Sequence, residues 1–357
     1  MGEEQAASVT KQFRQFDVVT DYSDHEYAEL KNPPINTGSA TYKTIMKEWK
    51  VLRDSLPESI YVRVYEGRID LLRAVIVGAS GTPYHNGLFF FDFQFPPSYP
   101  DVPPQGHYKS FGLHLNPNLY DSGYICLSLL NTWPGPKWEP WRSTMLQVLV
   151  SLQALVLNEK PYFNEPLLLI WFEKLSTRYN NDVFVMSCKT MMFLLQKNPN
   201  NFEDFIVEHF RSHGRDILTA CKVYTEGFAT VGHYQNEDSF LPERVHVSSE
   251  FKDSMTWVYP RLVKAFEKIQ KNGPNDPSLR NFISQLDLMI GKTKAEYIQK
   301  LEENKEENKK RMMKLDFFGK LKEIFGLNTS AESNAAGIEA SLLEKGSVGT
   351  KGIEACY

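Results

Sequence analysis

The chain opens with polar, irregular sequence, and its first regular hydrophobic pattern spans residues 41–56. Apolar side chains there recur every three to four residues, which predicts an amphipathic helix. Ser39 or Thr41 stands where such a helix begins and supplies a capping hydroxyl. The apolar face consists of Tyr42, Ile45, Met46, Trp49 and Leu52.

Three segments with the pattern of β-strands follow, at residues 60–65, 71–77 and 88–95. The first two are rich in β-branched residues and are separated by a glycine. In the third, phenylalanines at every second position alternate with Phe90, Asp92 and Gln94, which is the period of a strand. A fourth, shorter strand is expected around residues 107–111.

Two segments without periodicity separate this region from the helices that follow. Five prolines between residues 95 and 104 exclude both a helix and a central strand, so we expect a fixed loop. Residues 116–140 show no clear period and predict a second, long loop, and loops of this length in compact domains are often functional.

From residue 143 onward the pattern is predominantly helical. The segments with helical spacing are 143–157, 167–196, 202–212, 215–224 and much of the sequence beyond 250. Residues 301–314 are dominated by charge and 316–327 form a short amphipathic stretch. After Asn328, serine, glycine and alanine prevail, which predicts disorder.

Composition limits the class of protein. The chain has 357 residues, 42% of them hydrophobic, and a net charge of −4, which gives no electrostatic case for a nucleic-acid partner. Its apolar runs are too short to span a bilayer, and its start does not resemble a signal peptide. The four cysteines contain no CxxC pair, so neither a metal site nor a disulfide framework is predicted. We therefore expect a cytoplasmic or nuclear protein without a cofactor or metal.

Cys126 is the candidate for chemistry, because it lies in the long loop, beside the rigid proline-rich segment. A cysteine among apolar neighbours is more often an inert, packed thiol. However, Asn118 stands eight residues earlier, and an amide near a thiol can donate to an oxyanion at a thioester. A protease would need a histidine partner, and no sequence feature places His107 or His114 at the sulfur. A thiol that carries an acyl group to an amine fits these residues better.

These motifs, taken together and in order, resemble the ubiquitin-conjugating enzymes. The Phe-Pro, Tyr-Pro and Pro-Pro pairs between residues 95 and 104 match the proline-rich loop of that family. Residues 116–118 (Asn-Pro-Asn) match its His-Pro-Asn motif, and Cys126 matches its acceptor cysteine. The resemblance is closer to the large hybrid conjugating and ligase subclass and its plant relatives, which share Asn-Pro-Asn-Leu-Tyr, Cys-Leu-Ser and Pro-Tyr-Phe-Asn-Glu-Pro.

The resemblance implies an α+β fold, with a four-stranded antiparallel meander, flanking helices and a helical C-terminal extension. It implies that Cys126 accepts ubiquitin as a thioester from the activating enzyme and passes it to a substrate lysine. Asn118 would donate to the oxyanion or hold the loop, and Glu165 would orient the lysine. The partners implied are ubiquitin, the activating enzyme, protein substrates and, where one takes part, a ubiquitin ligase.

The sequence also departs from the family pattern. Asn116 replaces the usual histidine, Ser128 stands where Asp is frequent, and Asp101 replaces a bulky residue that docks RING-type ligases. Two alternatives stay open: a catalytically silent scaffold that binds ubiquitin or a partner, and transfer of another ubiquitin-like modifier.

We divide the chain into four parts on these grounds. They are a polar N-terminal extension (1–40), a conjugating core (41–200), a helical extension (201–295) and a charged, low-complexity tail expected to be disordered (296–357).

Overall fold

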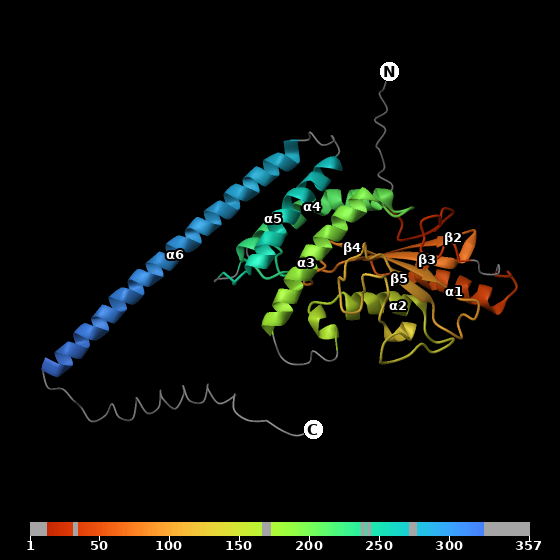
Figure 1. Cartoon of the computed structure of the whole chain (residues 1–357), viewed down its shortest axis with the longest axis horizontal. Coiled ribbons are helices and arrows are strands. Elements are labelled where there is room, and N and C mark those ends of the chain that lie inside the picture. Colours follow the sequence, from red (N-terminus) through yellow and green to blue (C-terminus); the bar gives the residue numbers. More distant parts are fainter. Residues whose placement is uncertain are drawn as a thin grey trace, which may run out of the picture. The chain divides into compact units, whose positions relative to one another are not determined.

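The computed structural model describes residues 13–30, 35–165, 173–236, 240, 244–270 and 277–324. It contains a sheet with the strand order β1-β2-β3-β4-β5 (Figure 1). The last four strands form the predicted antiparallel meander. The strands are β1 (Phe16–Val19), β2 (Ile60–Tyr65), β3 (Arg68–Val77), β4 (Leu88–Gln94) and β5 (Gln105–Tyr108). The α+β class is thereby confirmed.

The edge strand β1 corrects the prediction that the sequence before residue 39 is irregular. It pairs in parallel with β2, with Phe16 opposite Val62, so the sheet has five strands rather than four. A strand of four residues is too short to show a period in the sequence. Its conformation depends instead on a partner that lies more than forty residues away along the chain.

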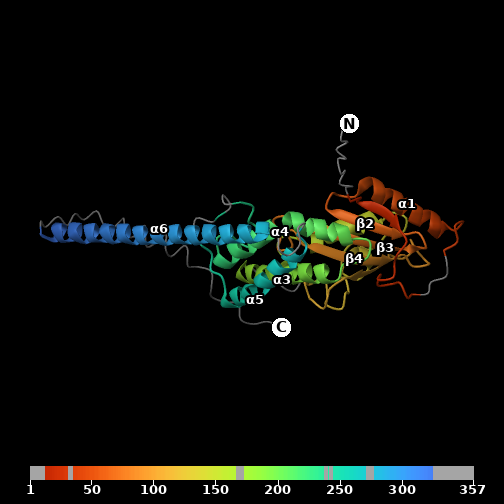
Figure 2. The same cartoon turned by 90° about the horizontal axis from the view of Figure 1, so that it is seen from above.

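One face of the sheet carries the main hydrophobic core. Helix α1 (Ala40–Ser55) lies on this face, and the side chain of Ser39 caps it by accepting from the Tyr42 amide. Helix α2 (Met145–Ser151) begins with a capping box and continues as the π-helix η2 (Leu152–Val156). Figure 2 shows the sheet from above, with α1 along it. The alternating phenylalanines of β4 point into this core, as the period of two predicts.

Glu48 joins three segments within this core. Its carboxylate accepts from the Tyr99 hydroxyl at 2.6 Å and from the Met145 amide at 2.9 Å. The first bond holds the proline-rich loop, which contains a cis Tyr99–Pro100 bond, and the second holds the start of α2. Burial raises the pKa of Glu48, while these two hydrogen bonds lower it.

The opposite face of the sheet contains a buried ion pair. Arg73 of β3 donates two hydrogen bonds to Asp92 of β4, at 2.6 and 2.8 Å. It also donates to Asp24 at 2.7 Å, and the Glu26 amide donates to Asp92 at 2.9 Å. The segment after β1 is therefore held on the sheet through charge-assisted bonds, which are stronger than neutral ones.

The remaining helices are α3 (Glu173–Gln196), α4 (Glu203–Glu226), α5 (Ser249–Lys268) and α6 (Pro277–Ile324). The sequence predicts two helices at 202–212 and 215–224, whereas α4 is continuous through Gly214. A β-carbon at Gly214 would lie 3.2 Å from Phe266, so this glycine serves helix packing and not a break. The predicted start of α3 at residue 167 lies outside the described residues.

The chain divides into two compact units, residues 1–287 and 288–357. In the second unit α6 stays helical to Ile324, where disorder was expected from residue 296. The expected disorder after Asn328 lies outside the described residues. Our division at residues 40, 200 and 295 stays a prediction.

The buried ion pair predicts a loss of stability in acid. Burial alone would raise the pKa of Asp92, but the hydrogen bonds and charge of Arg73 lower it to about 2. Because the unfolded pKa is higher, this carboxylate stabilises the fold above pH 4, and the contribution of about 2 kcal/mol disappears as the pH falls toward 2.

We therefore expect Asp92→Asn to lower the free energy of unfolding at pH 7 and to flatten its dependence on pH between 4 and 2. Chemical denaturation at several pH values measures both effects. Asp17→Asn, at a half-exposed carboxylate 4.0 Å from Arg14, is the matched control and should leave the slope unchanged. Equal slopes for the two variants would contradict the assignment.

Candidate active site

A small hairpin brings Asn118 and Cys126 together. The Cys126 amide donates to the Asn118 carbonyl at 2.9 Å, and the Asn118 side-chain amide donates to the Cys126 carbonyl at 3.1 Å. The turn between them contains Gly123 at φ +84°. A side chain there would also collide with the ring of His107, which lies within 2.6 Å of a β-carbon built on Gly123. Asn118 and Cys126, which are eight residues apart in sequence, therefore lie opposite each other in the hairpin.

Asn116 connects this hairpin to the rest of the site. Its side chain is fully buried and donates to the Tyr84 hydroxyl and to the Val156 carbonyl, both at 2.7 Å. Its oxygen accepts from the Asn118 amide at 2.8 Å and from the Asn164 side chain at 3.3 Å. All four hydrogen-bonding positions of one amide are thus used. The related enzymes usually have a histidine at this position, and its replacement raised the question of what supports the loop. The four hydrogen bonds of Asn116 supply that support.

Asn164 carries the network to the segment that ends at Glu165. Its side chain donates to the Val156 carbonyl at 3.1 Å and accepts from Asn158 at 2.6 Å. This fixes the 3-10 helix η3 (Pro161–Asn164), and the charge of the partly exposed Glu165, the next residue, acts on Cys126. The structure therefore brings Asn118 and Cys126 into contact, whereas Glu165 is linked to Cys126 by its charge alone.

The environment of Cys126 favours the neutral thiol. The side chain is 5% exposed, and burial raises its pKa; the charge of Glu165 also raises it. A hydrogen bond from the Tyr120 hydroxyl opposes both and lowers the pKa. The negative charge of a Cys126 thiolate in turn raises the pKa of Tyr120, which keeps that hydroxyl a donor. This balance favours a neutral thiol and not a thiolate activated by a base.

Sequence reasoning missed Tyr120 and Thr132. Tyr120 is 36% exposed, and its ring stacks on His114 with centroids 5.1 Å apart. Thr132 donates to the Ile125 carbonyl at 2.7 Å and accepts from the Leu127 amide at 2.9 Å, which fixes the backbone on both sides of Cys126. Tyr120 ends the Asn-Pro-Asn-Leu-Tyr motif and Thr132 lies six residues after Cys126 in the same loop, but nothing in the spacing predicted that either side chain lies near the cysteine.

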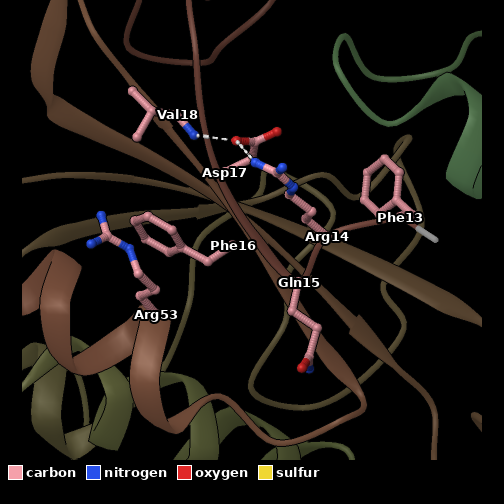
Figure 3. A pocket seen from close by; sticks show the side chains of 7 residues that line it. All are labelled: Phe13, Arg14, Gln15, Phe16, Asp17, Val18 and Arg53. Atoms are coloured by element: carbon pink, nitrogen blue, oxygen red, sulfur yellow. Dashed lines mark hydrogen bonds and ion pairs between the residues drawn. The ribbon is translucent and has the colours of Figure 1, made fainter. Parts of the chain in front are cut away.

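Other places in the described part of the chain carry less chemistry. The Nε2 atom of His107 lies 3.5 Å from a carboxylate oxygen of Glu26, and His114 stacks on Tyr120. A hollow of about 660 Å³ lies beside β1 and the end of α1. Figure 3 shows the side chains that line it, with Arg14 against Asp17 and Arg53 against Phe16. No cysteine or histidine lines it.

The described residues contain no cluster of three or more His, Cys, Asp or Glu side chains arranged to hold a metal ion. None of their helices has the length and apolar character needed to traverse a bilayer.

Comparison with known proteins places the chain in a family. The sequence model of the ubiquitin-conjugating enzymes matches residues 44–187. Ubiquitin-conjugating enzyme E2 39 of Arabidopsis thaliana is 44% identical over 313 residues, which cover 78% of this chain and 93% of that protein. Ubiquitin-conjugating enzyme E2 25 of the same plant is 48% identical over 269 residues, covering 71% of this chain and 43% of that protein.

The hybrid subclass is represented as well. The dual E2 ubiquitin-conjugating enzyme/E3 ubiquitin-protein ligase BIRC6 of Homo sapiens is 34% identical over 293 residues, covering 73% of this chain and 6% of that protein. Several of the plant relatives are long, and the chain spans between 24% and 49% of their length. The chain belongs to the ubiquitin-conjugating enzyme family, and its resemblance to that family is confirmed.

The geometry around the sulfur predicts opposite effects of two substitutions. Tyr120→Phe removes a donor to the thiolate and should raise the pKa of Cys126, whereas Glu165→Gln removes a negative charge and should lower it. We expect shifts of about 0.5 pH unit or more in the profile of alkylation rate by iodoacetamide.

The measurement is made in a Cys356→Ser background, because Cys188 and Cys221 are buried and Cys356 lies outside the described residues. Tyr124→Phe is the matched control, since its half-exposed ring packs against Tyr120 with centroids 6.0 Å apart. Profiles that move in the same direction for Tyr120→Phe and Glu165→Gln would refute this account of the thiol.

Proposed function

We propose that this chain is an active ubiquitin-conjugating enzyme with Cys126 as the acceptor. In the first step the Cys126 sulfur attacks the thioester that joins ubiquitin to the activating enzyme. A new sulfur–carbon bond forms, the old one breaks, and the thiol proton passes to the departing thiolate. The observation that carries the proposal is the buried, hydrogen-bonded hairpin that holds Cys126 opposite Asn118 and within electrostatic reach of Glu165.

In the second step a substrate lysine attacks the thioester carbonyl. Its nitrogen bonds to the carbonyl carbon, the carbon–sulfur bond breaks, and Cys126 regains a proton. Only the neutral amine is nucleophilic, so a carboxylate that orients the ammonium and accepts its proton accelerates the reaction. Glu165 is the partly exposed carboxylate that the geometry offers for this role.

Asn118 acts in this proposal as a support of the loop. Its side-chain amide is committed to the Cys126 carbonyl, on the main chain of the residue that would carry ubiquitin. A donor to the oxyanion, the other role considered, would have to reach the thioester carbonyl with its remaining N–H group.

The wider setting follows from the same proposal. The activating enzyme supplies the thioester at the expense of ATP, ubiquitin and protein substrates are the reactants, and a ubiquitin ligase takes part where a substrate needs one. Free thiols at Cys126, Cys188 and Cys221 are compatible with the cytoplasm or nucleus, where thiols are kept reduced.

The proposal is tested by charging the full chain with activating enzyme, ATP and ubiquitin. We expect an adduct on a non-reducing gel that thiols cleave. Cys126→Ser should give only a slower, thiol-resistant oxyester, because an alkoxide is a poorer leaving group than a thiolate. Cys126→Ala should give none.

Three results would count against the proposal. Charging of Cys126→Ala would show that another cysteine is the acceptor. No adduct with ubiquitin but one with a different modifier would change the substrate, and none with any modifier would favour a silent scaffold.

A substitution of Asn118 separates its two roles. As a loop support, Asn118→Ala should slow charging and discharge to free lysine by similar factors, because one buried hydrogen bond worth about 1 kcal/mol is lost from the loop that both steps use. Loss of an oxyanion donor would instead slow discharge by about 10²–10³ more than charging. Single-turnover rates of both steps, with the melting temperature as a control for folding, decide between them.

A further inference from the structure

Cys126 lies in a short extended segment whose two sides have different partners. On one side, Leu119 and Ile125 form an antiparallel bridge, and both main-chain groups of Cys126 are bonded to Asn118. The main-chain groups of successive residues in an extended segment point to opposite sides. The Ile125 carbonyl and the Leu127 amide therefore point away from Asn118, and both are bonded to the hydroxyl group of a single side chain.

That side chain is Thr132. Its hydroxyl donates to the Ile125 carbonyl at 2.7 Å and accepts from the Leu127 amide at 2.9 Å. The Leu127 carbonyl, at 3.1 Å, is a second acceptor for the same proton. Ile125 and Leu127 are 1% and 4% exposed. Removal of the hydroxyl therefore leaves a donor and an acceptor unpaired in a buried place, which is costly.

The two bonds close a ring around the main chain of Cys126. The ring runs from the Ile125 carbonyl through the N, Cα and C atoms of Cys126 to the Leu127 amide, and it returns through the hydroxyl oxygen. Because the peptide bonds on both sides of Cys126 are planar, the main-chain torsions that can vary within this ring are φ and ψ of Cys126 itself. One oxygen atom thus fixes the direction of the Cα–Cβ bond that carries the sulfur.

The turn that follows Cys126 holds Thr132 in place. The 3-10 helix η1 (Ser128–Leu130) leads to Asn131, which has the left-handed conformation with φ +59°. The Asn131 side-chain oxygen accepts from the Trp138 amide at 3.1 Å, and the Thr132 amide donates to the Leu127 carbonyl at 3.3 Å. The hydroxyl is therefore attached to a turn that is bonded on both sides.

We propose that Thr132 is a positioning residue, whose hydroxyl locks φ and ψ of Cys126 and so directs the sulfur for transfer. This inference rests on the proposed function of Cys126. Thr132 contacts neither reactant in this account and acts through the cysteine alone. Both charging and discharge depend on the place of the sulfur, and a displacement of a reacting group by about 1 Å can slow a reaction by about 10²-fold.

The test compares two variants of the full chain in single-turnover charging and in discharge to free lysine. Thr132→Val removes the hydroxyl but nearly keeps the shape, and we expect both rate constants to fall about tenfold or more. Thr132→Ser keeps the hydroxyl and should restore both rate constants to within about twofold. The concentration of activating enzyme at half-maximal rate should not change, because Thr132 does not bind it.

The amplitude of the reaction separates positioning from stability. A variant that is merely less stable contains less folded enzyme, so its amplitude falls while its rate constants stay. Thr190→Val is the matched control, since it removes a buried hydroxyl that donates to the Met186 carbonyl at 3.0 Å within α3. Its rate constants should stay unchanged. If Thr132→Val does not fold, Thr132→Ala takes its place, because it leaves room for a water that pairs both groups without tethering them.

The failures of the two proposals are distinguishable. If the chain charges but Thr132→Val or its substitute keeps its rate constants, or if Thr132→Ser or Thr190→Val loses as much, the positioning role is refuted. If the unchanged chain does not charge, the proposed function fails. Carbon-13 NMR of the full chain with labelled cysteine then still tests the lock, with the Cys126 signals identified by their loss in Cys126→Ser. Their Cα and Cβ shifts depend on φ and ψ, so they should move in Thr132→Val and stay in Thr132→Ser, and unmoved shifts in Thr132→Val would refute it.

Discussion

The candidate active site depends on one amide, that of Asn116, whose hydrogen-bonding positions are all used. Asn116 uses both N–H groups and both oxygen lone pairs on four different partners, and it does so in complete burial. A buried polar network of this kind is favourable only when every member is satisfied, because an unpaired group in a low dielectric is costly. The hairpin of Cys126, the end of η2 and the segment of Glu165 therefore hold their relative positions together, and disturbing one disturbs the others.

The chemistry of the sulfur follows from what surrounds it. Burial and a nearby carboxylate both favour the thiol, and only the Tyr120 hydroxyl favours the thiolate. Hydrolytic enzymes with a cysteine nucleophile need the opposite balance, a thiolate made by a base. A cysteine that carries an acyl group benefits from low reactivity, because its thioester has to persist until an amine attacks it. The environment of Cys126 is consistent with transfer and gives little support to proteolysis.

Much of this fold was predictable from local pattern, and the rest required contacts between distant residues. The helix at 41–56, the three main strands and the proline-rich loop all carry strong periodic or proline signals, and all were predicted within a few residues. Strand β1 was missed because four residues carry no period, and α4 was divided because Gly214 resembles a stop. Cys126 and Asn118 were candidates from their place in the long loop and gained support from a family resemblance, whereas Glu165 came from the resemblance alone. Tyr120 was missed because its approach to the sulfur depends on the turn at Gly123.

The π-helix at Leu152–Val156 has a consequence for how this region can change. Its wide turn, with the Leu157 amide bonded to the Leu152 carbonyl at 3.0 Å, accommodates one residue more than an α-helix would. The Val156 carbonyl thereby meets the side chains of Asn116 and Asn164. Leu155 is 60% exposed, so a change of its side chain would disturb little of the packing of the core. The length of the segment is constrained more strictly: removing a single residue would rotate Val156 by about 100° about the helix axis and turn its carbonyl away from both amides. Exposed side chains of this segment can therefore be exchanged, but its number of residues has to stay the same.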